Sequence, residues 1–328
     1  GVVTDAPTGV STTGITTTTG GTLTLDNGGV MTIAQNISVD GIFAQISSAG
    51  TGSVSIASPR SISTTGDAVS FASPVTLNGA GTTTIDTTTG ANPAGANVTF
   101  SSTLTGTTDS AEHLTLVAGS GGAVTFNGAV GAIRLGDVNI TQARDVTLQS
   151  GFNARTLTQS QGATGAPSTT PSVGTTTING AVNTTGSTSL ASSGALNVTS
   201  AGSITAGAGA TVTLTTGSDM TLSGSVSASA GATLNVIGTD RILTQNGGTL
   251  GTANSAIALI ADEMMLSSAI NSGSGAVTLK PNNPADAIQL GVASASTNNS
   301  AAMLELSDSE LNTISTTGGL TIGAANNT

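Results

Sequence analysis

The feature that most constrains this chain is a short apolar–polar–apolar unit that recurs between residues 256 and 322, with Gly, Asn and Ser between its copies. Clear examples are Ile257-Ala258-Leu259, Val277-Thr278-Leu279 and Leu320-Thr321-Ile322. Side chains two residues apart lie on the same face of a β-strand, so each unit predicts a very short strand with one apolar face. Such a strand cannot bury a core by itself and must stack on copies of itself. The sequence therefore predicts an all-β fold, a parallel β-solenoid of irregular coils.

Phenylalanine occupies matching places in three related units. These units read AVSF at 68–71, NVTF at 97–100 and AVTF at 123–126, and they lie 29 and 26 residues apart. Stacked coils would bring Phe71, Phe100 and Phe126 one above another. We therefore expect these rings to form an aromatic ladder inside the solenoid, which is a packing role and not a ligand-binding one.

The pattern also predicts the organisation of the chain. Residues 1–21 are Thr-rich and poor in large apolar side chains, which indicates an irregular lead-in, and residues 22–328 are expected to form a single β-solenoid. The stretch 162–174 holds two prolines, which cannot donate to a strand ladder, so we expect a loop insertion there. The apolar units predict roughly fifteen coils at normal strand spacing. Ser307 followed by Glu310 resembles a capping box and predicts one short helical turn.

Charge and composition exclude several classes of protein. The 328 residues carry 17 acidic and only 6 basic side chains, for a net charge of −11, and the basic residues are dispersed, which argues against nucleic-acid binding. No apolar run reaches the 18 residues that a membrane-spanning helix needs. The absence of Cys excludes disulfides and thiolate chemistry. The first residues lack the pattern of a signal peptide, so we expect a mature or internal piece of a longer protein.

Reactive side chains are sparse and do not form a recognisable motif. The single histidine, His113, follows Glu112 and is interpreted as a solvated turn residue at the start of a strand. Without Cys or a second His, a zinc site is not expected.

Two pairs of carboxylates are candidates for acid–base chemistry. Asp262 and Glu263 are adjacent and would face opposite sides of a strand. Asp308 and Glu310 fall in the predicted helical turn, where acidic residues suit the amino-terminal dipole. We therefore predict no enzyme, no catalytic residue, no cofactor-binding residue and no metal-binding residue.

An acidic repeat protein rich in Gly and Thr raises two further ligands, calcium and ice. The repeat and loop motifs that bind calcium are absent, so isolated aspartates are interpreted as turn residues. Thr22-Leu23-Thr24 and Thr211-Val212-Thr213 match the threonine array of some ice-binding solenoids, but most other units carry Asn, Ala or Ser at one of these places. Ice binding therefore remains a minor alternative.

Several strings of the sequence resemble a known family. ALIADEMMLSSAINSGSGAVTLKP at 258–281, LELSDSELNTI at 304–314 and LTLVAGSGGAVTFNGAVGAIRLGDVNIT at 114–141 are similar to the repeats of filamentous-haemagglutinin-like exoproteins. Those are large, mostly bacterial, secreted surface adhesins. The resemblance implies a right-handed parallel β-helix, an extracellular or cell-surface location and a role in adhesion. It carries over no functional residue.

These observations lead to one expected function and one rival. We expect a non-enzymatic extracellular structural shaft or adhesin segment, without membrane-spanning segments, that can form filaments. Neither end of the sequence offers a cap, so the expected partners are homotypic end-to-end contacts or continuing β-coils of a longer chain, with host or matrix glycans as further candidates. The alternative is a surface glycan-binding or glycan-cleaving β-helix module, because carboxylates from distant coils could meet on one face.

Overall fold

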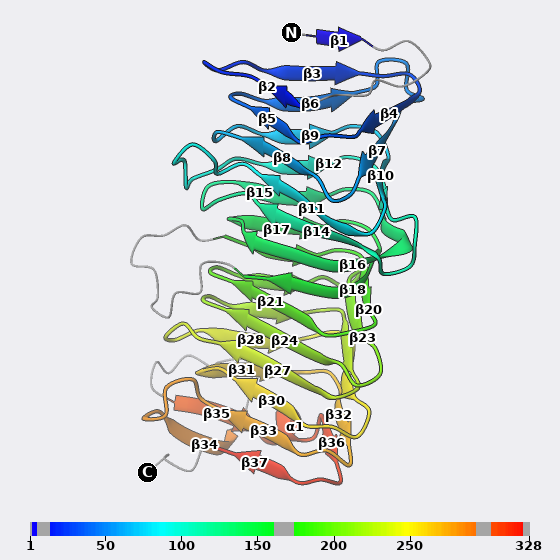
Figure 1. Cartoon of the computed structure of the whole chain (residues 1–328). Helices are drawn as coiled ribbons and strands as arrows, with labels where there is room; N and C mark the ends of the chain where they lie inside the picture. Colours follow the sequence, from blue (N-terminus) through cyan, green and yellow to red (C-terminus); the bar gives the residue numbers. More distant parts are fainter. Residues whose placement is uncertain (1, 5–13, 161–173, 293–302, 324–328) are drawn as a thin grey trace. The chain divides into compact units, whose positions relative to one another are not determined.

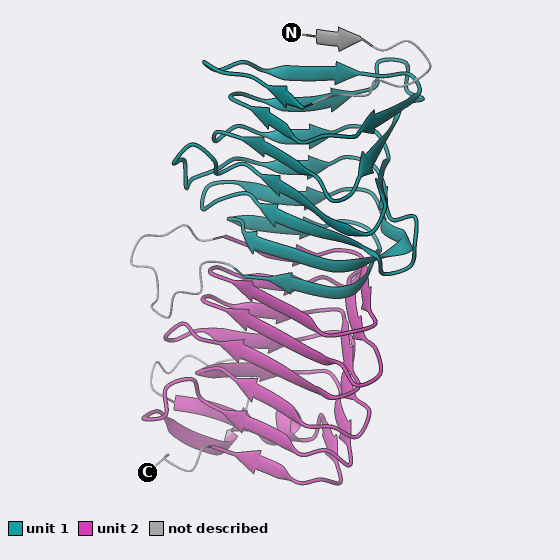
Figure 2. Ribbon diagram, viewed as in Figure 1, with its two compact units in different colours: residues 1–162 teal, residues 163–328 magenta. Residues whose placement is uncertain are grey.

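The computed structural model describes residues 2–4, 14–160, 174–292 and 303–323. Two compact units, Gly1–Gly162 and Ala163–Thr328, are each built of parallel strands stacked turn upon turn (Figures 1 and 2). Together the units hold about 11 turns with almost no helix, which confirms the predicted all-β parallel β-solenoid. The loop insertion expected at 162–174 lies, apart from Gly174, outside the described residues.

In the first unit, most turns contribute one strand to each of three faces, and equivalent strands pair in parallel. The first face holds β1 (Val2–Thr4), β3 (Leu23–Asp26), β6 (Phe43–Ile46), β9 (Val69–Phe71), β12 (Val98–Phe100), β15 (Ala123–Phe126) and β17 (Asp145–Leu148). The second face holds β4 (Val30–Ile33), β7 (Ser53–Ala57), β10 (Val75–Asn78) and β13 (Leu104–Thr105). The third face holds β2 (Ile15–Thr16), β5 (Ile37–Val39), β8 (Ser61–Thr64), β11 (Gly81–Asp86) and β14 (Glu112–Val117). Two long strands, β16 (Val130–Gln142) and β18 (Phe152–Gln159), continue the second and third faces together.

The second unit repeats this arrangement. Its first face holds β19 (Thr176–Ile178), β22 (Leu196–Val198), β25 (Met220–Leu222), β28 (Ile242–Gln245) and β31 (Glu263–Leu266). Its second face holds β20 (Ala181–Thr184), β23 (Ser203–Ala206), β26 (Ser225–Ala228), β29 (Leu250–Thr252), β32 (Ile270–Gly273) and β36 (Ile314–Thr316). Its third face holds β21 (Thr188–Ser192), β24 (Thr211–Thr216), β27 (Gly231–Val236), β30 (Ile257–Ile260), β33 (Val277–Lys280) and β37 (Leu320–Ile322). A separate parallel pair, β34 (Ala287–Val292) and β35 (Met303–Ser307), precedes α1 (Asp308–Leu311).

The core follows directly from the alternating pattern. In β33, Val277 and Leu279 are fully buried, whereas Thr278 between them is partly exposed. Identical side chains stack in register on successive turns, as in the column of Leu214, Leu234, Leu259 and Leu279. Each buried Leu contributes roughly 1.5–3 kcal/mol, so many short strands together form a stable interior.

The predicted aromatic ladder is confirmed and is longer than expected. The ring centroids of Phe71 and Phe100 lie 5.3 Å apart, and those of Phe100 and Phe126 lie 5.1 Å apart with nearly parallel planes. Phe43 and Phe152 extend the ladder at its two ends, each 5.4 Å from its neighbour but tilted or edge-on. All five rings are buried.

Strand pairing begins earlier in the chain, and is denser in each turn, than the sequence indicated. β1 and β2 lie inside the segment 1–21 that was expected to be irregular, and both pair with strands of the following turns. The expected fifteen coils are too many, because up to three apolar units belong to one turn. Leu196, for example, lies on the first face, whereas Val212 lies on the third face of the same unit.

The one helix of the described ranges, α1, begins as the sequence predicted. The Ser307 N–H donates to Glu310 Oε2 at 2.8 Å, and the Glu310 N–H donates to Ser307 Oγ at 3.3 Å, which completes the capping box. The helix contacts β31, the last first-face strand of the described residues. No helix in the described ranges has the length and apolarity needed to cross a membrane.

Candidate functional site

The outer surface of β14, β16 and β18 in the first unit gathers charged side chains of both signs. Two neighbouring groups form there, and we name each by its arginine. The Arg134 depression is lined by Asp109, Gly131, Ala132, Ile133, Arg134 and Asn153. The Arg155 cluster consists of His113, Asp137, Arg155 and Thr156.

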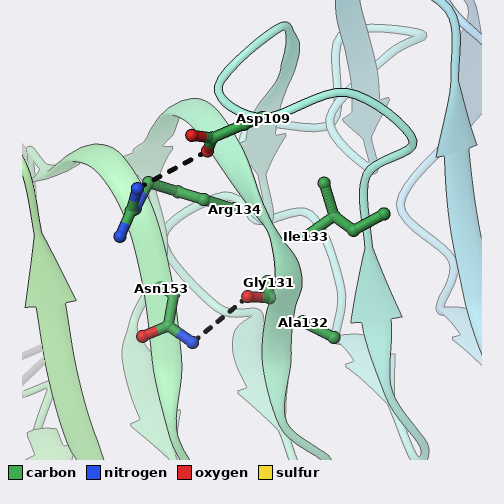
Figure 3. Close-up of a pocket in the computed structure, with 6 residues that line it drawn as sticks. All are labelled: Asp109, Gly131, Ala132, Ile133, Arg134 and Asn153. Carbon is green, nitrogen blue, oxygen red and sulfur yellow. Dashed lines mark hydrogen bonds and ion pairs between the residues drawn. The ribbon is translucent and has the colours of Figure 1, made fainter.

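A bulge in β16 creates the depression. Val130 pairs with Phe152 and Leu135 pairs with Ala154, so the four β16 residues between them oppose the single residue Asn153 of β18. Bulges of this kind turn side chains away from their regular directions and are frequent beside functional sites. Here the result is an open, shallow depression of about 400 Å³ (Figure 3).

The backbone of the bulge is held by the turns on both sides. Gly131 has a φ of +76°, which glycine adopts without strain. Its carbonyl oxygen and three of the polar backbone groups that follow are hydrogen-bonded. The bonds run from Asn153 Nδ2 to Gly131 O (3.1 Å), from Ile133 N to Thr105 Oγ1 (2.9 Å), from Gly106 N to Ile133 O (3.2 Å) and from Ser110 N to Arg134 O (2.8 Å). The bulge is thus a fixed structure with its side chains directed outward.

Arg134 is only loosely paired. Its Nη1 lies 3.5 Å from Asp109 Oδ1, and the Asp109 side chain is 67% exposed, so this ion pair contributes little. The Nε of Arg134 is buried and has no acceptor. A buried donor without a partner is unfavourable and calls for an explanation. Ile133, next to it, leaves 42% of its surface exposed at the depression.

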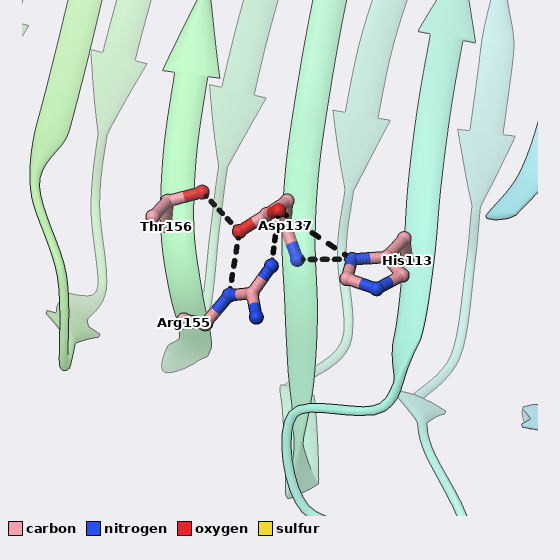
Figure 4. Close-up of polar contacts among 4 residues, drawn as sticks. All are labelled: His113, Asp137, Arg155 and Thr156. Carbon is pink, nitrogen blue, oxygen red and sulfur yellow. Dashed lines mark hydrogen bonds and ion pairs between the residues drawn. The ribbon is translucent and has the colours of Figure 1, made fainter. Parts of the chain in front are cut away.

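Arg155 and Asp137 form a much tighter pair (Figure 4). Arg155 Nε donates to Asp137 Oδ1 at 2.8 Å and Arg155 Nη2 donates to Oδ2, which is the two-bond fork of a strong arginine–carboxylate contact. Thr156 Oγ1 also donates to Asp137 Oδ1 at 2.8 Å. The hydrogen bond from Arg155 is the main reason that the pKa of Asp137 lies below its ordinary value, and the same contact raises the pKa of Arg155.

His113 is part of this cluster, so its interpretation as a solvated turn residue is wrong. It lies within β14, and its Nδ1 accepts a hydrogen bond from the Asp137 N–H at 2.8 Å. The 3.6 Å approach of Nδ1 to Asp137 Oδ2 is too long for a hydrogen bond. These contacts join β14, β16 and β18.

The acidic pairs considered from the sequence belong to the second unit. Asp262 is buried and accepts from the N–H groups of Asn283 at 2.9 Å and Asp240 at 3.2 Å. Glu263 is partly exposed in β31, and burial followed by the nearby Asp240 raises its pKa. The two neighbouring carboxyl groups therefore have different surroundings.

The two members of the other pair, Asp308 and Glu310, also differ in their exposure to solvent. Asp308 is exposed in the first turn of α1, whereas Glu310 is buried in the capping box. Both positions suit acidic residues because the amino-terminal end of a helix is electropositive.

Sequence reasoning missed a third acidic group. Asp286 is 7% exposed, and Asn283 Nδ2 donates to its Oδ1 at 2.6 Å, while the Asn283 N–H donates to Asp262. Burial, and then the charge of Asp262, raises the pKa of Asp286. These two acids are 24 residues apart, and only the path of the chain between β31 and β34 brings them together. Within the described ranges, no three His, Cys, Asp or Glu side chains gather in an arrangement that could hold a metal ion.

The Arg134 depression was also missed. Its residues come from three successive turns, and the bulge that shapes it is not visible in the alternating pattern. One signal was present, because Arg134 interrupts an apolar stretch between two glycines in GAIRLG at 131–136. No protein-family model, curated protein or solved structure matches this chain. Its class is thus defined by its fold, a parallel β-solenoid.

Proposed function

We propose that this chain is a non-enzymatic structural shaft or adhesin segment of a cell-surface exoprotein similar to the filamentous-haemagglutinin-like adhesins. The proposal rests on the β-solenoid fold together with the resemblance of residues 114–141, 258–281 and 304–314 to the repeats of that group.

The observation that most supports a structural role is that the charged side chains of the Arg155 cluster bond to one another across neighbouring turns. In the Arg155 cluster, Asp137 receives both an arginine fork and a threonine hydroxyl, and its backbone N–H is taken by His113. These contacts join neighbouring turns of the solenoid. Contacts that hold neighbouring turns together are what a structural shaft requires.

Removal of one complete turn tests this role. Leu196 is the register partner of Met220, so deletion of residues 197–220 joins two equivalent points of the first face and keeps the alternating pattern. A shaft should retain cooperative unfolding and a β-type far-UV spectrum after this deletion. Deletion of 197–208, which breaks the register, is the matched control and should unfold. Loss of folding in both variants would contradict the proposal.

The cell-surface location has its own test. Antibodies raised against the 328-residue chain should label intact cells of the organism that makes it. Labelling that requires permeabilised cells would contradict an extracellular shaft. An antibody to a known cytoplasmic protein provides the control for cell integrity.

End-to-end assembly is the third part of the proposal. In the described residues, β36 and β37 pair with strands on one side only, and Leu320 in β37 is 40% exposed. Exposed strand edges pair with further strands. Light scattering of the chain should therefore show a mass that rises with concentration, and Thr321→Lys should reduce the rise. A monomeric mass at all concentrations would exclude this contact.

Glycan binding is a second candidate function, and the Arg134 depression favours it. A bulge that directs a loosely paired arginine and an exposed isoleucine into an open hollow is not needed for stacking. A panel of neutral and acidic oligosaccharides tests this candidate, with saturable binding of at least one glycan as the expected result.

A further inference from the structure

The Arg134 depression has donor capacity that the protein itself does not use. A guanidinium group offers five N–H donors in a planar fork. At Arg134 one contact is a 3.5 Å approach to an exposed carboxylate, and Nε has no acceptor at all. By contrast, the guanidinium group of Arg155, one turn further along, donates two hydrogen bonds to the carboxylate of Asp137.

The occupant that suits such a group is a carboxylate. Planar carboxylates accept two parallel hydrogen bonds from one arginine, and such pairs are both strong and directional. Binding in this way requires the Arg134 side chain to move away from Asp109 so that Nε can reach the ligand. That movement breaks only a long ion pair with a partner that is 67% exposed, so it costs little.

The remaining lining indicates what kind of molecule carries the carboxylate. Peptides that bind to strands use backbone hydrogen bonds. Here the Gly131 and Arg134 carbonyls and both polar backbone groups of Ile133 already have partners within the protein. Recognition must therefore come from side chains. A carboxylate such as Asp109 accepts hydrogen bonds from hydroxyl groups, and Ile133 offers a small apolar surface.

We propose that the Arg134 depression binds an acidic sugar, a uronic acid residue of a glycan, with Arg134 leaving Asp109 to hold the sugar carboxylate. Asp109 then accepts hydrogen bonds from ring hydroxyls, and Ile133 contacts the apolar face of the ring. The ligand thus separates the two members of an existing ion pair and gives each a better partner. This inference rests on glycan binding, the second candidate function above, and is independent of the structural shaft.

Calorimetric titration of the full 328-residue chain with a galacturonic acid oligomer at low salt tests the proposal. The matched probe is the same oligomer with its carboxyl groups reduced to alcohols. For one shallow site we expect a Kd on the order of 0.1–1 mM for the acidic oligomer. The neutral oligomer should bind at least about tenfold more weakly, because the arginine–carboxylate fork is lost.

Two variants assign the binding to this depression. Arg134→Gln should weaken binding of the acidic oligomer at least about tenfold. Arg60→Gln, which changes the net charge equally at a distant arginine bonded to the Ala34 carbonyl, should change it less than about twofold. Asp109→Asn should strengthen binding, because it removes the competing carboxylate and keeps an oxygen for ring hydroxyls. A merely structural role of Arg134 would not produce this opposite pair of effects.

Each other outcome has a definite meaning. Equal binding of the acidic and neutral oligomers would overturn the acidic-sugar assignment while glycan binding itself stands. Binding that is insensitive to both Arg134→Gln and Asp109→Asn would overturn the site. No saturable heat up to about 10 mM of either oligomer would overturn the proposal. If thermal unfolding shows that Arg134→Gln does not fold, the response of Asp109→Asn decides.

Discussion

The carboxylate of Glu310 accepts a hydrogen bond from the backbone N–H of Leu266, with 3.2 Å between Oε1 and N, although the two residues are 44 positions apart. Its other oxygen accepts from Ser307 N at 2.8 Å. Glu310 therefore completes the capping box of helix α1 and also accepts a hydrogen bond from Leu266 of β31. Strand β31 is the last described strand of the first face in the second unit. A single buried side chain thereby covers part of a sheet edge that would otherwise be open.

Replacement of Glu310 should expose that edge. Glu310→Ala leaves the N–H groups of Leu266 and Ser307 without acceptors, and we expect a loss of about 1–3 kcal/mol in the free energy of unfolding. Hydrogen exchange at Leu266 should accelerate as well. Asp308→Ala, in the same helical turn but exposed, is the control and should cost only about 0.3–1 kcal/mol. Equal effects of the two variants in urea unfolding would show that the Leu266 contact is unimportant.

The aromatic ladder gives a second prediction. Phe100 stacks between Phe71 and Phe126, so Phe100→Ala should leave a cavity and cost roughly 3–5 kcal/mol. Phe100→Leu should cost less because it fills more of the space. Thr99→Ala, on the partly exposed side of the same strand, should stay within about 0.5 kcal/mol of the parent protein. Chemical unfolding of the three variants measures the order, and a cost for Thr99→Ala equal to that of Phe100→Ala would contradict it.

The ladder also shows how far the sequence alone could predict the fold. Phe71, Phe100 and Phe126 share a four-residue motif, and their strands pair in register. Phe43 and Phe152 lie outside the motif. Phe43 is the register partner of Val69, two residues before Phe71, so its ring meets the ladder diagonally. Local alternation thus predicts strands and their inward side chains, but contacts that depend on the exact offset of each turn need the structure.

The same limit applies to the candidate site. Arg134, Asp109 and Asn153 meet because a bulge shifts the register between β16 and β18. His113 and Asp137 lie on neighbouring turns whose lengths the sequence does not fix. A pattern with a period of two residues gives the face on which a side chain lies, but not its neighbour on the next turn.

The pKa of Asp286 gives a pH-dependent prediction. Its pKa is raised in the folded protein by burial and then by Asp262, so the folded state binds this proton more tightly than the unfolded state does. Its contribution to stability is then fully present below the ordinary value of 3.8 and is lost as the pH rises through the folded pKa. Asp286→Asn keeps the hydrogen bonding and removes the titration. Its Tm relative to the parent protein should rise across this window and then level off, and a difference that stays constant with pH would contradict this prediction.

Asp137 should behave in the opposite way. Its pKa is lowered by Arg155, so its contribution is present above the ordinary value of 3.8 and is lost as the pH falls through the folded pKa. Asp137→Asn should therefore destabilise the protein at neutral pH, by less than about 1 kcal/mol because the pair is partly exposed. The difference between variant and parent protein should vanish in acid. A difference that persists at the lowest pH would assign the effect to packing and not to charge.

The bulge that forms the Arg134 depression depends on Gly131. Its φ of +76° places it in the left-handed region, and a Cβ there would collide with the carbonyl oxygen of Asn153. Gly50 has a similar φ of +72° but nothing within 4 Å of the position that a Cβ would take. Gly50→Ala should therefore cost only the conformational strain of about 1–2 kcal/mol. Gly131→Ala adds a steric clash with backbone, so urea unfolding should show a loss that is larger by at least about 1 kcal/mol. Equal losses in the two variants would mean that β18 moves aside easily and that the bulge is not the fixed structure on which the depression relies.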